Sequence, residues 1–187
     1  RAVAHVGGLP VVLKASGGEG GVGVMRADSW PALFGLVDHL LSQGAAPRLM
    51  AYVPDGLHWR VVVVGDRAVA AYPNPVGKDD FRSEPSEDLS AYTDQPEPDL
   101  AELAVEATQA LGLAFAGVDL LVHPSGRTYV LEVNFPCYFP HAQEEADIDV
   151  AGPMVDWLWA KAQALVAGSP GGGVAAGGAG TDSASAT

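Results

Sequence analysis

The sequence predicts an α+β fold in which antiparallel sheets are flanked by helices. Two observations carry this prediction. Runs of apolar and β-branched residues are joined by short turn signals, Gly65-Asp66 and Ser125-Gly126, which is the pattern of β-hairpins. Other segments place apolar residues at helical spacing. With 187 residues, 48% of them hydrophobic, the chain is long enough for one domain, or two small ones, around a buried core.

Two short strands around a glycine-rich loop open the chain. Residues 10–14 (PVVLK) and 22–25 (VGVM) are rich in β-branched residues, and the loop ASGGEGG lies between them. A helix follows, because Ser29 suits an N-cap, Pro31 suits the first helical turn and Gly44 suits the end. We therefore expect a small strand–loop–strand–helix unit at the amino end.

A strand, a hairpin and a long loop occupy the middle of the chain. RLMAYV at 48–53 predicts one strand, and the segments 58–64 and 67–72 flank the first two-residue turn. Residues 73–98 are rich in Pro, Asp, Glu and Ser and predict a loop. Loops of this length in compact domains are often functional.

A helix and a second hairpin follow the long loop. Asp99 suits an N-cap, Glu102 lies at the capping-box position, and Gly112 ends the helical pattern. The segments 115–122 and 128–134 then predict two strands joined by a short PSG turn.

The chain ends in a helix and a tail of simple composition. The helix is predicted at about residues 150–166. Its apolar face consists of Met154, Val155, Leu158, Leu165 and Val166. We expect Trp157 and Trp159 to pack this helix against the rest of the protein. Residues 167–187 consist mainly of Ala, Gly and Ser without periodicity and are predicted to be disordered.

The charge balance excludes several classes of partner. The formal net charge is -13, from 23 Asp and Glu against 10 Lys and Arg, so neither nucleic acid nor an anionic membrane is an expected partner. Cys137 is the only cysteine, which excludes an intramolecular disulfide and a Cys-cluster zinc site. Because no apolar run is long enough for a membrane span and no signal peptide is visible, we expect a cytoplasmic protein.

Two carboxylates lie inside the most apolar strands. Burying an unpaired charge costs free energy, yet Asp119 lies in GVDLLV and Glu132 in VLEVN, and neither has an apparent salt-bridge partner in the sequence. If the turn is the two-residue Ser125-Gly126, Asp119 and Glu132 face each other across the hairpin, and Asn134 shares their face. A three-residue turn with a bulge would shift this register.

Three oxygen-bearing side chains on one face suggest a site for a divalent cation. Like charges directly opposite each other repel, and a cation between them removes that repulsion. Mg²⁺ prefers a few carboxylate oxygens and usually binds together with substrate phosphates. The alternative is a sheet with one solvent-exposed face, on which the acidic side chains lie without a metal ion.

The glycine-rich loop suggests an anion site. Backbone N–H groups of such a turn can converge on an anion, and Lys14 at the end of the first strand is a point charge suited to phosphate. The loop is not a Walker A motif, because no GK[ST] follows the glycines, and it is not a Rossmann fingerprint, because it leads into a strand. The alternative is a flexible loop beside a surface lysine.

Taken in order, these elements resemble the ATP-grasp fold, and most of all the RimK-type amino-acid ligases. In that branch a strand lysine precedes a loop of the form G-x-x-G-x-G-V, and here Lys14 precedes GEGGVGV. The motifs GVD and LEVN, an arginine before a VVG hairpin, and DDFRSE, which is similar to the branch's GDFRSN, extend the resemblance from about residue 9 to 160.

The resemblance implies a nucleotide cleft between the sheets, with ATP and Mg²⁺, or Mn²⁺ in its place, as cofactors. For the nucleotide it implies Lys14, Gly17, Gly18, Gly21, Gly23, Ala51, Tyr52, Val53 and Asp55. For the metal it implies Asp119, Glu132 and Asn134. It further implies that Arg60 and Arg82 bind the transferring phosphoryl group or the substrate carboxylate.

The resemblance also implies a division of the chain. Residues 1–166 would form a partial ATP-grasp domain, with a nucleotide-binding part at 1–53 and a metal-binding part at 54–166. The family carries an N-terminal α/β domain before the glycine loop. The chain starts at Arg1 without an initiator Met and reads as a piece of a longer protein, so we expect that domain to be missing from it.

The implied reaction is an ATP-dependent carboxylate–amine ligation through an acyl phosphate. The expected substrates are a small-molecule carboxylate and an amine, or a peptide, and we allow for a homo-oligomer. Two alternatives stay open. The chain could be a non-catalytic remnant that binds nucleotide or a partner, or it could serve another ATP-grasp chemistry, such as D-alanine–D-alanine-type ligation or carboxylation.

Several positions depart from the branch. Met50-Ala51 stands where the branch often has Gln-Glu, and His58 replaces the acid before the arginine. Asn74-Pro75 replaces an arginine pair. After LEVN, a Pro-Gly turn is replaced by the bulky FPCYFPH. We therefore expect an acceptor specificity that differs from that of the glutamate ligases.

Overall fold

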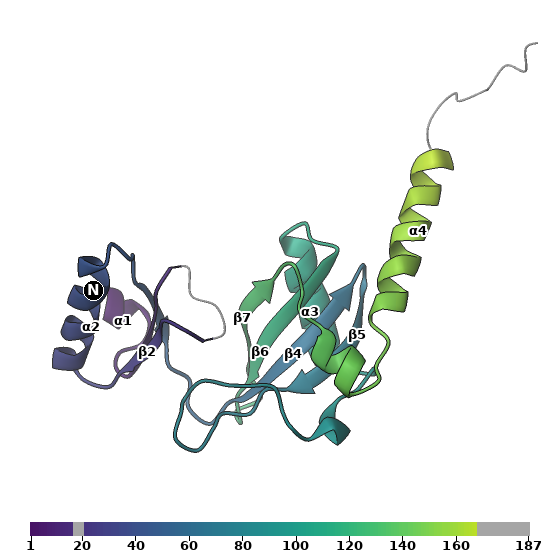
Figure 1. Cartoon of the computed structure of the whole chain (residues 1–187). Helices are drawn as coiled ribbons and strands as arrows, with labels where there is room; N and C mark the ends of the chain where they lie inside the picture. Colours follow the sequence, from purple (N-terminus) through teal and green to yellow (C-terminus); the bar gives the residue numbers. More distant parts are fainter. Residues whose placement is uncertain (17–20, 168–187) are drawn as a thin grey trace, which may run out of the picture.

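The computed structural model describes residues 1–16 and 21–167, and these residues form two antiparallel sheets with flanking helices (Figure 1). The strands are β1 Val11–Lys14, β2 Val24–Ala27, β3 Arg48–Ala51, β4 Leu57–Val64, β5 Arg67–Pro73, β6 Phe115–Val122 and β7 Thr128–Asn134. The helices are α1 Ala2–His5, α2 Trp30–Ser42, α3 Pro98–Ala110 and α4 Ala151–Ala167, with a 3₁₀ turn η1 Leu89–Ala91 and a π-helical turn η2 His141–Glu145. The strand orders are β2-β1-β3 and β5-β4-β6-β7, which confirms the predicted α+β class.

The three-stranded sheet has a core of its own. Val11 and Leu13 of β1 are fully buried and pack with Leu33 and Leu40 of α2. Successive residues of a strand point to opposite faces, so Lys14 lies on the face away from α2. This alternation leaves that face of the small sheet open for a ligand or for the other sheet.

The predicted signals of α2 are confirmed. The Ser29 side chain accepts a hydrogen bond from the N–H of Ala32 at 3.4 Å, and Pro31 lies in the first turn. Gly44 follows the helix with φ +71°, a left-handed conformation that glycine adopts without steric cost. Capping residues at both ends therefore define this helix.

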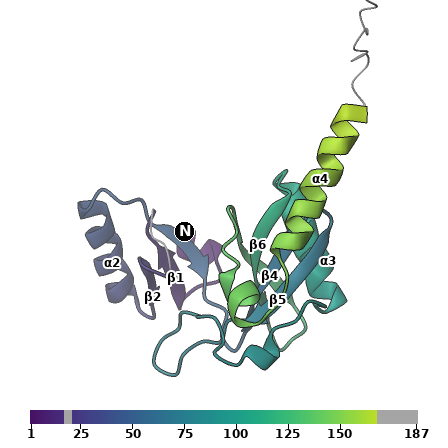
Figure 2. The same ribbon diagram turned by 45° about the vertical axis from the view of Figure 1, so that its right-hand side comes forward.

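The four-stranded sheet is covered on both faces. Val61 and Val118 pack against Leu100 and Ala104 of α3 on one face. The next residue of β4, Val62, lies in a second cluster on the other face, which includes residues of η2 and the segment before α4. The two views agree that α3 and α4 lie on opposite faces of this sheet (Figures 1 and 2).

The predicted start of α3 is wrong by two residues. Asp99 is not the N-cap, because the helix begins at Pro98 and its N-cap, Glu97, makes no side-chain capping bond. Proline suits the first helical position, since its fixed φ is helical and it has no N–H to satisfy. Asp99 instead lies in the first turn, where a carboxylate interacts favourably with the helix dipole. The predicted end at Gly112 is confirmed by its φ of +69°.

The hairpin between β6 and β7 has the longer of the two turns that the sequence allows. His123 and Arg127 pair through the backbone at 2.8 Å, so three residues, not two, make the turn. A bulge at Leu131 then compensates, because Leu120 pairs with Val130 while Asp119 pairs with Glu132. The expected pairing of the two carboxylates is therefore confirmed, although it forms through the alternative, a three-residue turn with a bulge, and not through the two-residue turn.

The last helix projects from the body (Figures 1 and 2), and most of its predicted apolar face is exposed. Trp157 packs edge-on against Phe115, with ring centroids 5.3 Å apart, as expected of a packing residue. Trp159 is 66% exposed, which contradicts its predicted role. The exposed apolar residues of α4 also include Val155, Leu158, Leu165 and Val166. No helix in the described residues is long and apolar enough to cross a membrane.

Candidate active site

A row of four polar side chains crosses the four-stranded sheet. Tyr72 of β5 is the register partner of Arg60 of β4, Arg60 is the partner of Asp119 of β6, and Asp119 is the partner of Glu132 of β7. Directly opposed residues of antiparallel strands point to the same face. All four side chains therefore share one face, and Asn134, two residues after Glu132, shares it as well.

Asp119 is held from two sides. Arg60 donates from Nε to Oδ1 at 2.6 Å and from Nη2 to Oδ2 at 3.1 Å, and Asn134 donates from Nδ2 to Oδ2 at 3.0 Å. Burial raises the pKa of Asp119, and Arg60 opposes this rise. The absence of a salt-bridge partner, inferred from the sequence, is thus wrong for Asp119. Its partner lies 59 residues away on β4, where no local pattern reveals it.

Glu132 is paired across the two sheets. Its Oε2 lies 3.7 Å from Nζ of Lys14 on β1. The side chain of Glu132 is 54% exposed and that of Lys14 is 26% exposed. This contact brings the predicted phosphate-binding lysine to the predicted metal ligands, and it also shows that the second acid has a partner.

Close packing surrounds Arg60. A Cβ on Gly117, the partner of Asn134, would lie 2.7 Å from Nη1 of Arg60 and 3.0 Å from Sγ of Cys137. Burial raises the pKa of the Cys137 thiol to about 11 and that of Tyr72 to about 12. Cys137 packs in the second apolar cluster, as expected for an apolar filler. Gly117 was not predicted, although a glycine inside a strand often marks a close approach.

The described part of the glycine loop adopts turn geometry. Gly21 and Gly23 have φ values of +77° and +78°. The Ala15 N–H donates to the Gly23 carbonyl at 2.9 Å, and a Cβ on Gly23 would lie 3.0 Å from that of Ala15. Gly17 and Gly18 lie outside the described residues, as do residues 168–187 of the predicted tail.

Arg82 lies with the glycine loop and not in the row on the large sheet. Its Nε donates to both carboxylate oxygens of Asp80, at 3.1 Å to Oδ1 and 2.9 Å to Oδ2, and its Nη1 donates to the Gly21 carbonyl at 3.3 Å. The hydrogen bonds from Arg82 lower the pKa of Asp80 to about 2. The long loop thereby contacts the glycine loop at Gly21, a predicted nucleotide-binding residue.

The predicted adenine hinge is the connection between the sheets. Ala51 ends β3, and Tyr52, Val53 and Asp55 follow it, with Asp55 in a left-handed turn at φ +57°. The Arg26 guanidinium lies 4.1 Å from the centroid of the Tyr52 ring. A cavity of about 640 Å³ opens here, between Tyr52, Arg26 and residues 76–81 of the long loop.

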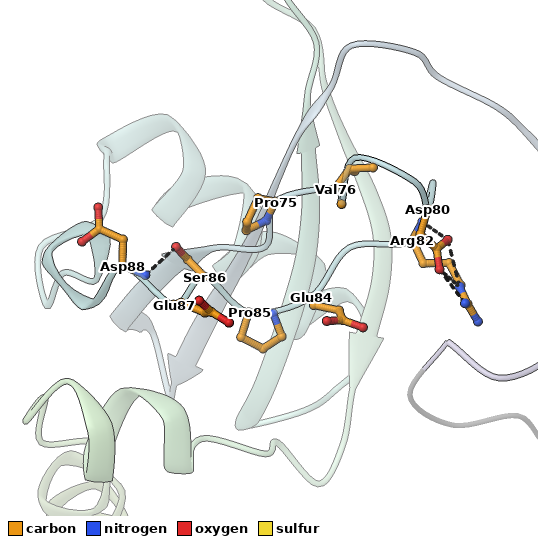
Figure 3. Close-up of a pocket in the computed structure, with 10 residues that line it drawn as sticks. Pro75, Val76, Asp80, Arg82, Glu84, Pro85, Ser86, Glu87 and Asp88 are labelled. Carbon is orange, nitrogen blue, oxygen red and sulfur yellow. Dashed lines mark hydrogen bonds and ion pairs between the residues drawn. The ribbon is translucent and has the colours of Figure 1, made fainter.

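A second cavity, of about 440 Å³, lies within the long loop itself (Figure 3). Its lining includes Pro75, Glu84, Pro85 and Ser86, and Arg82 with its partner Asp80 lies at one end of it. Neither Lys14 nor any predicted metal ligand lines this cavity. The loop cavity is therefore not the place where the paired charges of the two sheets meet.

The donor set on the large sheet suits a hard cation. Asp119 and Glu132 offer carboxylate oxygens, and Asn134 keeps its Oδ1 while its Nδ2 is used. Such oxygen donors are those that Mg²⁺ prefers, together with phosphate oxygens. Within the described residues no group of three or more His, Cys, Asp or Glu could hold a metal, so any site here depends on the amide and on a ligand.

Comparison with known proteins gives a consistent result. The family model of the RimK-like ATP-grasp domain matches residues 1–158. A probable alpha-L-glutamate ligase of Citrobacter koseri is 33% identical over 155 residues, which are 82% of this chain and 51% of that protein. The ribosomal protein bS6–L-glutamate ligase of Escherichia coli K12 is 32% identical over the same shares. The chain spans about half the length of these curated relatives.

Solved structures share the fold. The ATP-grasp ligase PsnB, complexed with a phosphomimetic precursor variant, Mg and ADP, has a TM-score of 0.62 at 23% identity, over 84% of this chain and 48% of that one. The RimK domain ATP-grasp protein of Sphaerobacter thermophilus has a TM-score of 0.56 at 22% identity, over 84% and 55%. At these identities the likeness concerns the fold alone.

Proposed function

The chain belongs to the RimK-like ATP-grasp family, and we propose that it forms the phosphate- and metal-binding part of an ATP-dependent carboxylate–amine ligase. One observation carries the proposal. Lys14 on the small sheet meets Glu132 on the large sheet at 3.7 Å, in a row that includes Asp119. In this proposal residues 1–53 hold the nucleotide and residues 54–166 supply the metal ligands.

Each side of the cleft has its own task. Lys14 and the backbone N–H groups of the glycine loop bind the phosphates, and the hinge at Ala51–Asp55 binds the adenine. Asp119, Glu132 and Asn134 would hold Mg²⁺, which neutralises the charge that develops on the transferring phosphoryl group. PsnB was solved with Mg and ADP, which supports this pair of cofactors for the present chain.

Arg60 acts in this proposal as a positioning residue. Its bidentate contact fixes the orientation of the Asp119 carboxylate, and Asn134 donates a further hydrogen bond to the same carboxylate. Such contacts hold a ligand group in place before the metal and nucleotide arrive. Arg82, which contacts Gly21 of the glycine loop, is the better candidate for direct contact with a phosphoryl oxygen or a substrate carboxylate.

The proposed reaction begins when a substrate carboxylate oxygen attacks the γ-phosphorus of ATP. An acyl phosphate and ADP result, and an amine then attacks the acyl carbon and displaces inorganic phosphate. The relatives' names, which mention L-glutamate, a ribosomal protein and a precursor, support an amino acid or a peptide as substrate. The exposed rings of Phe135 and Tyr138, directly after the Asn134 position, support an acceptor that differs from that of the glutamate ligases.

The test is substrate-dependent ADP release by the complete product of the gene, measured beside its thermal midpoint. Glu132→Ala should abolish ADP release and leave the midpoint nearly unchanged, because the side chain is half exposed and its ion pair is weak. Lys14→Ala should weaken Mg-ATP binding by ~1.5 to 3 kcal/mol, the cost of one charge-assisted hydrogen bond. Glu106→Ala, on the exposed surface of α3, is the matched control.

The results separate the possible roles. Unaltered turnover in folded Glu132→Ala would reject the metal assignment. Activity that falls only in proportion to the folded fraction would show a structural role. No ADP release by the parent protein with any mixture of amino acids and short peptides would reject the ligase and favour a non-catalytic nucleotide-binding protein.

A further inference from the structure

The open face of the small sheet carries two adjacent cations. Lys14 of β1 is the register partner of Arg48 of β3, so both side chains lie on the face away from α2. Like charges directly opposite each other on a sheet destabilise it. The two cations are adjacent even though the chain has more than twice as many acidic as basic residues. A repulsive pair of cations is expected where an anion binds.

The partners of the two cations are unequal. Lys14 lies 3.7 Å from Glu132, but Arg48 is exposed and makes no ion pair or side-chain hydrogen bond within residues 1–16 and 21–167. Glu132 is thus the counter-charge of Lys14 alone, and Arg48 has none among the described residues. If Glu132 turns to a metal ion, Lys14 is left in the same state.

Arg48 also begins its strand close to the glycine loop. The Ser16 hydroxyl donates to the Ala46 carbonyl at 3.1 Å, which joins the start of the loop to the residues just before β3. The Ala15 N–H bonds to the Gly23 carbonyl at the other end of the loop. Lys14, Arg48 and the described ends of the glycine loop therefore lie at the same end of the sheet.

We propose that Arg48 is a second cationic ligand of the nucleotide phosphates, beside Lys14. The inference rests on the proposed function, since it assigns a residue to the same nucleotide site. A planar guanidinium can bind two phosphate oxygens at once, whereas the lysine ammonium acts as a point charge. The two cations together match a polyphosphate better than either does alone.

The experiment compares ligands that differ only in their phosphates. Calorimetric titration of the complete gene product with Mg-ADP, adenosine and inorganic triphosphate should show that Arg48→Ala weakens ADP and triphosphate binding at least 10-fold and leaves adenosine binding unchanged. The affinity of the variant for ADP should also depend less steeply on salt. Arg127→Ala, at the exposed β6–β7 turn, removes a cation of the same kind far from the loop and should bind like the parent.

A second variant separates binding from structure. Arg48→Glu places an acid opposite Lys14, which should maintain or raise the thermal midpoint while ADP affinity falls further than in Arg48→Ala. A midpoint that falls together with ADP affinity would assign Arg48 a structural role and overturn the inference.

The remaining outcomes are also decisive. If Lys14→Ala weakens ADP binding and Arg48→Ala does not, the nucleotide site stands and the role of Arg48 is rejected. Equal losses for ADP and adenosine would reject a phosphate contact. If the parent binds no ADP, the proposed function fails and this inference fails with it.

Discussion

At the scale of single residues, the site depends on the absence of a side chain at one position. Gly117 lies on β6 beside Asn134, and its missing Cβ leaves the space that the Arg60 guanidinium occupies. Arg60 can reach both oxygens of Asp119 only because that space is free. A glycine is thus as much a part of the predicted metal site as the carboxylate itself.

Gly117→Ala should therefore destabilise the protein. The new Cβ would lie 2.7 Å from Nη1 of Arg60, so the guanidinium must move and the pair with Asp119 must loosen. We expect a loss of ~1 to 3 kcal/mol in the free energy of unfolding, the usual cost of overpacking. Urea denaturation measures it.

A second glycine is the control for this prediction. Gly35 lies within α2, and a Cβ there would meet nothing within 4 Å. Gly35→Ala should stabilise the protein by roughly 0.5 to 1 kcal/mol, because alanine favours the helix. If both substitutions shift the unfolding free energy in the same direction, the steric account of Gly117 is wrong.

Strand periodicity predicts which residues share a face, but not which strands are neighbours. Asp119, Glu132 and Asn134 could be placed together because a hairpin joins their strands. Arg60 could not be placed beside Asp119, because β4 and β6 are separated by β5, a long loop and α3. The ion pair between Lys14 and Glu132 joins two different sheets, and no periodicity within one segment of the sequence predicts such a contact.

At the scale of elements, apolar spacing predicts that a helix forms but not how much of it is covered. The predicted bounds of α4 are close to the observed ones, yet the helix leaves the sheet after its first turns (Figure 2). Trp157 packs where the helix still touches the β4–β5 turn, and Trp159 does not. Both tryptophans lie in the same predicted helix, and the sequence assigns them the same packing role. Only the tertiary structure distinguishes them.

These two tryptophans offer a matched test. Trp157→Ala should lower the free energy of unfolding by up to ~3 kcal/mol, because its ring packs on Phe115. This is the low end of the range for a large aromatic residue, since the ring is not fully buried. Trp159→Ala should change it by no more than about 0.5 kcal/mol, as expected of an exposed position. Thermal or urea unfolding of both variants measures the difference. Equal losses would mean that the exposed half of α4 is covered in solution.

At the scale of the whole molecule, the chain consists of two units with separate apolar cores. The small unit is built around β1 and α2, and the large unit around the four-stranded sheet. Between them lie the hinge after β3 and polar contacts such as those of Lys14 with Glu132 and of Arg82 with Gly21. Exposed ion pairs stabilise weakly, so these contacts hold the cleft without locking it. Under the proposed function, such weak coupling would let the two units separate and exchange nucleotide.

The two units should therefore respond separately to a core mutation. Leu13 is fully buried in the small core, and Leu13→Ala should destabilise that unit by ~2 to 5 kcal/mol. Because small units bury a limited fraction of their surface and are marginally stable, we expect the unit to open measurably. Hydrogen exchange read by mass spectrometry should show faster exchange in β1, β2, β3 and α2, and unchanged protection in β6.

Val118→Ala, in the large core, is the converse variant and should accelerate exchange in β4 and β6 first. Equal acceleration of both units by either variant would show that the chain unfolds as one cooperative body, and that the polar contacts across the cleft couple the units more strongly than exposed ion pairs do.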